Sequence, residues 1–134
     1  ATGDSIEIAH LIVEAACDSS DGTIDTEERR TVAAAVALWV LEENEAGAPP
    51  EPDEIARFTL AEILFEAMSA ESAAKIRDGK RPTWASAEGQ RQMRRAAETL
   101  AQRAELSATG ATAAELERAI EQGLETLRAI WSDS

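Results

Sequence analysis

Residues 17–28, CDSSDGTIDTEE, form an acidic stretch around one glycine, and the segments on either side of it decide the fold of the N-terminal half. Before it, apolar residues recur at helical spacing and predict a helix over residues 4–17. After it, Asp25 is followed three residues later by Glu28, a capping-box pattern that predicts a second helix over residues 26–46. We therefore expect an acidic loop between two helices.

The acidic loop (residues 17–28) has the layout of a twelve-residue calcium-binding loop, in which oxygen atoms converge around a turn at the sixth position. Gly22 takes the sixth position, and Ile24 takes the eighth, where an apolar residue usually anchors the loop. The ligand positions are filled by Ser19, Asp21, Thr23 (through its carbonyl), Asp25 and Glu28. The first position is Cys17, whose thiol is a poor ligand for a hard cation. The pattern predicts a divalent-cation site, for calcium, that lacks its first ligand.

A second interpretation explains the same loop without a metal ion. Asp21 and Gly22 are typical of a turn, while Asp25 and Glu28 cap the second helix. Both interpretations stay open at this point.

The rest of the chain is also helical in pattern, with breaks at the proline-rich residues 48–52, at 78–82 and at 107–110. The expected helices span residues 4–17, 26–46, 53–69, 70–77, 86–106 and 112–131. The chain has no strand candidate, and 134 residues suit one domain. We predict an all-α protein, a compact bundle of five or six helices forming a single domain over residues 1–134.

The last expected helix carries a narrow apolar seam, which consists of Leu116, Ile120, Gly123, Leu127 and Ile130. This spacing is typical of helices that pack side by side. We expect the seam to pack lengthwise on the fourth helix, against Met93 and Leu100. A homodimer contact through part of the seam is the alternative.

The charge is unevenly distributed. Residues 1–75 hold 17 acidic and 4 basic side chains, so they account for the whole net charge of −13. Such a surface repels nucleic acid and attracts cations or basic protein surfaces, so we expect a basic protein partner and no nucleic acid. At the end of the second helix, Glu42, Glu43 and Glu45 crowd a turn where the helix dipole disfavours negative charge, which marks them as candidate partner-binding residues.

A basic cluster surrounds one tryptophan in the second half of the chain. It consists of Lys75, Arg77, Lys80, Arg81, Arg91, Arg94 and Arg95, with Trp84 among them. One interpretation is that these side chains pair with the acidic half, within the molecule or between copies. The other is a contact for a partner, with Trp84 as its anchor and Arg91, Arg94 and Arg95 on one helix face.

The sequence offers no catalytic constellation. His10 stands alone, Cys17 has no basic neighbour in the sequence and lies beside carboxylates that should raise its pKa, and no phosphate-binding loop is present. We expect a protein that is not an enzyme. No apolar run approaches the roughly 20 residues of a membrane span. The single cysteine requires no oxidising compartment, so we expect a cytoplasmic protein that does not insert into membranes; whether Ala1 is the native N-terminus stays open.

The segments Leu11-Ile12-Val13-Glu14-Ala15-Ala16 and Ser20-Asp21-Gly22-Thr23-Ile24-Asp25-Thr26-Glu27-Glu28 resemble the TerB-like tellurite-resistance helical family. The resemblance covers residues 6–40; Ser20 stands where the family has alanine, and the C-terminal half has no second copy. It implies an all-helical fold, acidic side chains that hold a divalent cation, and a role in stress response or membrane-associated complexes.

Two hypotheses for function follow. The first is a non-enzymatic helical interaction module of TerB-like type with a divalent-cation loop. The alternative is an acidic inhibitor protein, of the immunity, anti-restriction or anti-CRISPR type, that mimics nucleic acid by presenting its negative charge to a basic groove.

Overall fold

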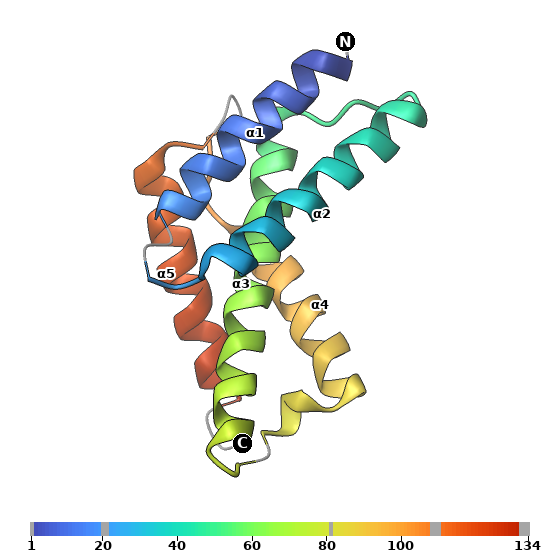
Figure 1. The fold of residues 1–134 in the computed structure, drawn as a ribbon. Coiled ribbons are helices and arrows are strands. Elements are labelled where there is room, and N and C mark those ends of the chain that lie inside the picture. The colour runs from blue at the N-terminus through green and yellow to red at the C-terminus, as the bar shows by residue number, and fades with distance from the viewer. Residues whose placement is uncertain (1, 20–21, 81, 108–110, 132–134) are drawn as a thin grey trace.

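The computed structural model describes residues 2–19, 22–80, 82–107 and 111–131 of the chain (Figure 1). Within these ranges the structure is helical, with no strand. The elements are α1 (Thr2–Ser19), α2 (Thr26–Glu45), α3 (Pro52–Arg77), the short 3-10 helix η1 (Thr83–Ala85), α4 (Ala87–Arg103) and α5 (Ala113–Ile130). The prediction of an all-α bundle with five or six helices is confirmed.

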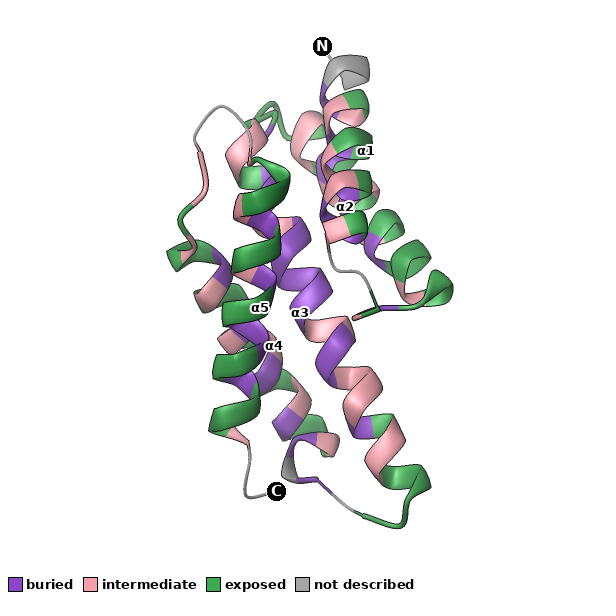
Figure 2. Ribbon diagram, turned by 90° about the vertical axis from the view of Figure 1, so that its left-hand side faces the viewer, coloured by how far each residue is buried: buried purple, intermediate pink, exposed green. Residues whose placement is uncertain are grey.

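Helix α3 lies at the centre of the bundle and contacts every other helix. The antiparallel pair α1 and α2 crosses one end of α3, while α4 runs antiparallel to α3 and α5 runs parallel to it on the other side (Figure 1). Figure 2 shows that burial is concentrated along α3, whereas α5 turns a largely exposed face outward. A helix in this position must be apolar on several faces, and α3 accordingly has eleven buried residues.

Helix α3 is continuous, whereas the sequence indicated two pieces over residues 53–69 and 70–77. The proposed break contains neither glycine nor proline, and Ala70 is a strong helix former. Ser72, just beyond that point, is buried. Buried residues on both sides of the expected break stabilise one continuous helix that ends at Arg77.

The local signals at the helix ends are confirmed. Asp25 and Glu28 form the reciprocal capping box of α2, and Thr112 and Glu115 form that of α5. Ser86 caps α4 by accepting a hydrogen bond from the Gly89 backbone N–H at 3.0 Å. These motifs need only residues three apart, so they form wherever the sequence supplies them.

The seam of α5 packs differently from the expectation. α5 does contact α4, but its more extensive contacts are with α3 and α1. Leu116, Ile120 and Leu127 are buried within the chain, and Ile130 is exposed. The expected contact of α5 with α4 is therefore present, but the longer and more apolar α3 forms the more extensive contact with α5 because it takes the central place. A homodimer through the seam stays a prediction, although its core residues are already covered.

No helix in the described ranges is both long enough and apolar enough to cross a membrane.

Candidate functional site

The two carboxylates at the end of the acidic loop are both used to cap α2. The Asp25 carboxylate accepts a hydrogen bond from the Glu28 backbone N–H, and the Glu28 carboxylate accepts one from the Asp25 backbone N–H, each at 2.8 Å. Each bond uses one carboxylate oxygen and leaves the other for solvent or a cation. The capping interpretation of this loop is therefore confirmed, and it does not by itself exclude a cation.

The other predicted ligands of the loop are only partly described. Ser19 ends α1 and donates a hydrogen bond to the Ala15 carbonyl at 2.7 Å, while Thr23 is half-buried. Ile24 is buried, as expected of the residue that anchors the loop. Asp21 lies outside the described residues. In the described part of the chain no three acidic, histidine or cysteine side chains gather around one point, and the calcium prediction stays untested.

The loop faces further carboxylates that sequence reasoning missed. An open hollow is lined by Ser19 and Thr23 on one side and by Glu117, Glu121 and Glu125 of α5 on the other. These three glutamates recur every four residues, which places them on one face of α5, but only the fold brings that face to the loop. Arg128 also lines the hollow and pairs with Glu71, so three glutamates and one arginine give the walls a net negative charge.

Glu66, in the middle of α3, is a second residue that the sequence did not single out. Burial raises the pKa of its carboxyl group, and the negative charges of Glu28 and Glu62 raise it further, against the opposing effect of Arg94. Glu66 is half-buried beside the capped start of α2. No periodicity marks it, because its neighbours come from a distant part of the chain.

Cys17 is buried at the end of α1, and burial raises the pKa of its thiol. The expectation that it has no basic neighbour is wrong: Arg29 of α2 lies close enough to oppose the rise and forms an ion pair with Asp18 at 2.7 Å. Since burial outweighs the arginine, the thiol is protonated at neutral pH and has little nucleophilic character.

The C-terminal part of α2 presents an apolar and acidic surface. Leu38 is 59% exposed and Leu41 is 43% exposed, on the side of α2 opposite the buried valines of the core. Glu42 follows Leu38 by one turn, and Glu45 follows Leu41 by one turn, so the four side chains are neighbours on the helix. We call Leu38, Leu41, Glu42 and Glu45 the acidic–leucine face. Glu43 does not belong to this face, because it follows Val40 by three residues and Val36 by seven, which places it on the valine side of α2, where it is half-buried.

A pocket of about 460 Å³ lies between α2, α3 and α4. Its apolar wall is formed by Trp39 and Phe58, whose rings are stacked with centroids 4.4 Å apart and planes 5° from parallel. Its charged residues are Asp53, Glu54, Glu62, Glu98, Arg57 and Arg94. We call this the aromatic pocket. Sequence reasoning missed it, since its walls come from three helices.

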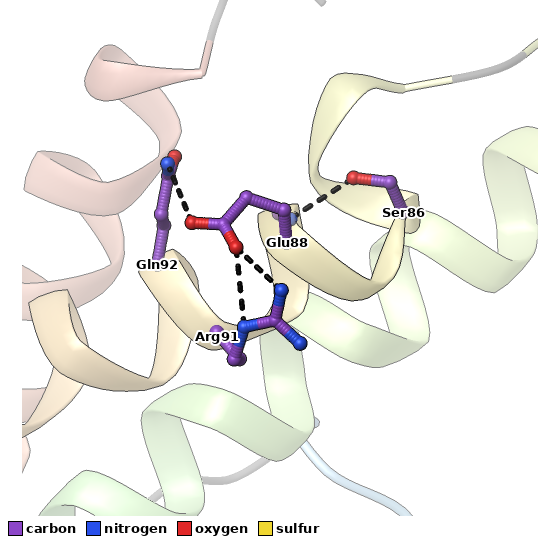
Figure 3. Close-up of polar contacts among 5 residues, drawn as sticks. Ser86, Glu88, Arg91 and Gln92 are labelled. Carbon is purple, nitrogen blue, oxygen red and sulfur yellow. Dashed lines mark hydrogen bonds and ion pairs between the residues drawn. The ribbon is translucent and has the colours of Figure 1, made fainter.

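The basic cluster does not form one surface. Arg94 makes an ion pair with Glu62 at 2.8 Å and places its guanidinium 4.0 Å from the centroid of the Phe65 ring. Arg91 instead pairs with Glu88 of its own helix, and Gln92 donates to the same carboxylate (Figure 3). Arg95 is exposed and has no polar partner among the described residues. Pairing with the acidic half is therefore confirmed for Arg94 but does not describe Arg91.

Trp84 is not an exposed anchor. It is the middle residue of η1, is 2% exposed with its side chain in the core, and has the Lys75 ammonium 4.6 Å from its ring centroid. A side chain so fully covered offers no area to a partner, so the prediction that Trp84 anchors one is wrong. Arg81 of the same cluster lies outside the described residues.

Comparison of the chain with models of protein families, with curated proteins and with solved structures finds no match. The resemblance to the TerB-like family therefore stays a prediction.

Proposed function

We propose that this chain is a non-enzymatic helical interaction module that binds a basic protein partner through the acidic–leucine face of α2. The observation that carries the proposal is the exposure of Leu38 and Leu41 beside Glu42 and Glu45. The last turn of α2 holds no basic residue, and the two glutamate side chains have no polar partner in the described part of the chain.

Apolar burial and charge both favour binding of a partner at this face. Burying the leucines against a partner contributes about 25 cal/mol per Å² of apolar area removed from water. The carboxylates then select a partner of opposite charge and accelerate its approach, since the net charge of −13 acts over the whole N-terminal half. A second copy of the chain carries the same charge on this face, so a different, basic protein suits it better. An amphipathic basic helix has the matching pattern of apolar and positive side chains.

The proposal can be tested with a defined probe, a synthetic amphipathic helix with leucines on one face and lysines on the other. Binding to the full chain is measured by fluorescence anisotropy at two salt concentrations. Leu38→Ser with Leu41→Ser should weaken binding about tenfold, since each leucine loses its buried apolar area. Glu42→Gln with Glu45→Gln should weaken binding and reduce its dependence on salt.

A matched control comes from Ile76, which is 52% exposed at the end of α3, far from the acidic–leucine face in sequence. Ile76→Ser should leave binding unchanged. Equal losses in the Ile76 and leucine variants would refute the proposed surface. The alternative function, an acidic inhibitor that mimics nucleic acid, predicts competition for the groove of the natural basic partner. If duplex DNA displaces that partner from the acidic–leucine face, the partner uses its nucleic-acid groove to bind the chain.

We also propose that the acidic loop binds a divalent cation. Support comes from the buried anchor Ile24, from the carboxylate oxygens of Asp25 and Glu28 that the capping hydrogen bonds do not use, and from the glutamates of α5 across the hollow. Oxygen ligands of this kind suit calcium.

A further inference from the structure

We propose that the aromatic pocket between α2, α3 and α4 binds an organic cation, the guanidinium or ammonium group of a basic side chain inserted by the partner. This inference rests on the proposed function for the source of the cation. Cation binding itself is inferred from the residues that line the pocket, so it can be tested without the partner.

The aromatic pocket is negatively charged overall, because four carboxylates and two guanidinium groups line it. Arg57 is committed elsewhere: its Nη1 donates to the carbonyl oxygens of Ala101 and Ala104, each at 2.8 Å, at the C-terminal end of α4. Arg94 is committed to Glu62 and to the Phe65 ring. Both guanidinium groups are thus already partnered, although each keeps further N–H donors, and the four carboxylates outnumber them.

Three carboxylates of the pocket are not neutralised by these arginines. Asp53 and Glu98 make no hydrogen bond or ion pair with any described residue. Glu54 uses one oxygen to accept the Glu51 backbone N–H at 3.0 Å and has the other to spare. A neutral apolar ligand would remove water from these groups without replacing its hydrogen bonds, which is unfavourable. A cation donates hydrogen bonds to them.

The aromatic wall of the pocket suits a guanidinium group. The parallel stack of Trp39 and Phe58 provides a flat apolar surface, and a guanidinium plane packs well on such a ring. The volume of about 460 Å³ falls within the range of roughly 300–1,000 Å³ that ligand pockets occupy. An arginine or lysine side chain can therefore place its alkyl stem on the rings and its charge among the carboxylates.

The pocket also adjoins the acidic–leucine face. Trp39 and Glu42 are three residues apart on α2, which makes them neighbours on the helix surface. A partner helix that covers Leu38 therefore passes beside the pocket and can direct one basic side chain into it.

The test uses the full chain and N-acetyl-arginine amide as the probe, with N-acetyl-citrulline amide as the neutral analogue of nearly the same shape. Binding is followed by NMR shifts of the Trp39 indole N–H. The arginine probe should give saturable shifts in the millimolar range, and the citrulline probe should give none that saturate. Glu98→Gln and Asp53→Asn, which keep side-chain size, should each weaken the arginine probe about two- to fivefold.

Glu7→Gln, at an exposed position of α1, removes the same charge outside the pocket and should leave the affinity unchanged. The inference is overturned if both probes bind equally, if no saturable shift appears, or if Glu7→Gln matches Glu98→Gln. The leucine variants Leu38→Ser with Leu41→Ser separate the two proposals. They should retain the arginine probe while binding the helical peptide about tenfold more weakly. If the unsubstituted chain binds the arginine probe but not the helical peptide, only the proposed function is refuted.

Discussion

Leu64 of α3 occupies the space that a side chain at position 123 of α5 would need. A Cβ atom on Gly123 would lie 2.8 Å from both Cδ1 and Cδ2 of Leu64, which is closer than side chains normally approach. Leu64 is fully buried and has little room to rotate away. The glycine in the apolar seam therefore permits the close approach of α5 to α3.

Gly123→Ala should destabilise the fold by about 1 kcal/mol, measured by urea unfolding. Alanine favours the helix by about 1 kcal/mol relative to glycine, but overpacking a buried contact costs about 1–3 kcal/mol. The double variant with Leu64→Ala tests the cause, since removing the leucine side chain makes room for the new methyl group. The two changes together should destabilise less than the sum of the single changes, by at least about 0.5 kcal/mol. A stabilised Gly123→Ala variant would contradict this account of the seam.

The reciprocal cap at the start of α2 gives a second prediction. Asp25→Ala removes the acceptor for the Glu28 N–H and should destabilise the fold by about 1 kcal/mol in urea unfolding. Asp25→Asn or Asp25→Ser retains a capping oxygen and should restore most of the loss. Glu27→Ala, at an exposed neighbouring position, is the control and should change stability by less than about 0.5 kcal/mol. Equal effects at Asp25 and Glu27 would show that the cap contributes nothing.

The calcium prediction can be separated from the cap with one conservative substitution. Glu28→Gln keeps a side-chain oxygen for the Asp25 backbone N–H but removes the carboxylate that would bind calcium through both oxygens. If the loop binds calcium, calorimetric titration of the metal-free protein should give heat that Glu28→Gln abolishes, and calcium should raise the Tm of the unsubstituted protein alone.

The double variant Asp21→Ala, Glu28→Ala serves as the second reference for the calcium experiment. Its response to calcium should match that of Glu28→Gln, although its stability without calcium should be lower because the hydrogen bond from the Asp25 backbone N–H to the Glu28 side chain is lost. If all three proteins respond alike, the loop is no calcium site and acts only as a turn and cap.

The features that the sequence predicts well are local. The two capping boxes, Asp25 with Glu28 and Thr112 with Glu115, each join residues three apart, so both partners can be identified from a short stretch of sequence. Helical periodicity likewise identifies the buried Val32, since neighbouring turns repeat the pattern. For this reason the helical segments and most of their boundaries could be predicted without the structure, apart from the false break within α3.

The features that the sequence hides depend on residues far apart in the chain. The stack of Trp39 on Phe58 joins α2 to α3, and the ion pair of Arg94 with Glu62 joins α4 to α3. No local pattern selects these pairs, so the aromatic pocket stayed unseen. The burial of Trp84 is hidden for the same reason, because an aromatic residue two positions after a proline has the same local sequence whether it is buried or exposed.

Glu66 predicts how stability depends on pH. Its pKa in the folded protein is raised above its ordinary value of 4.5, mainly by burial and then by the charges of Glu28 and Glu62. Between these two pKa values the folded state holds a proton that the unfolded state has lost. The contribution of Glu66 is therefore most favourable below the ordinary pKa, and it is lost as the pH rises through the raised one.

Glu66→Gln replaces the carboxyl group with a neutral group of the same shape, so the variant should gain stability over the unsubstituted protein as the pH rises. We expect a difference close to zero at about pH 4 and a gain of roughly 0.5 kcal/mol at about pH 7, measured by urea unfolding at each pH. Glu7→Gln, at an exposed position of α1, removes one negative charge and controls for the net charge of the protein. Since Arg94 opposes the rise, Arg94→Gln should enlarge the gain from Glu66→Gln at neutral pH. A Glu66→Gln variant that loses stability at neutral pH would show that the ionised carboxylate stabilises the fold, contrary to the crowding of negative charge around it.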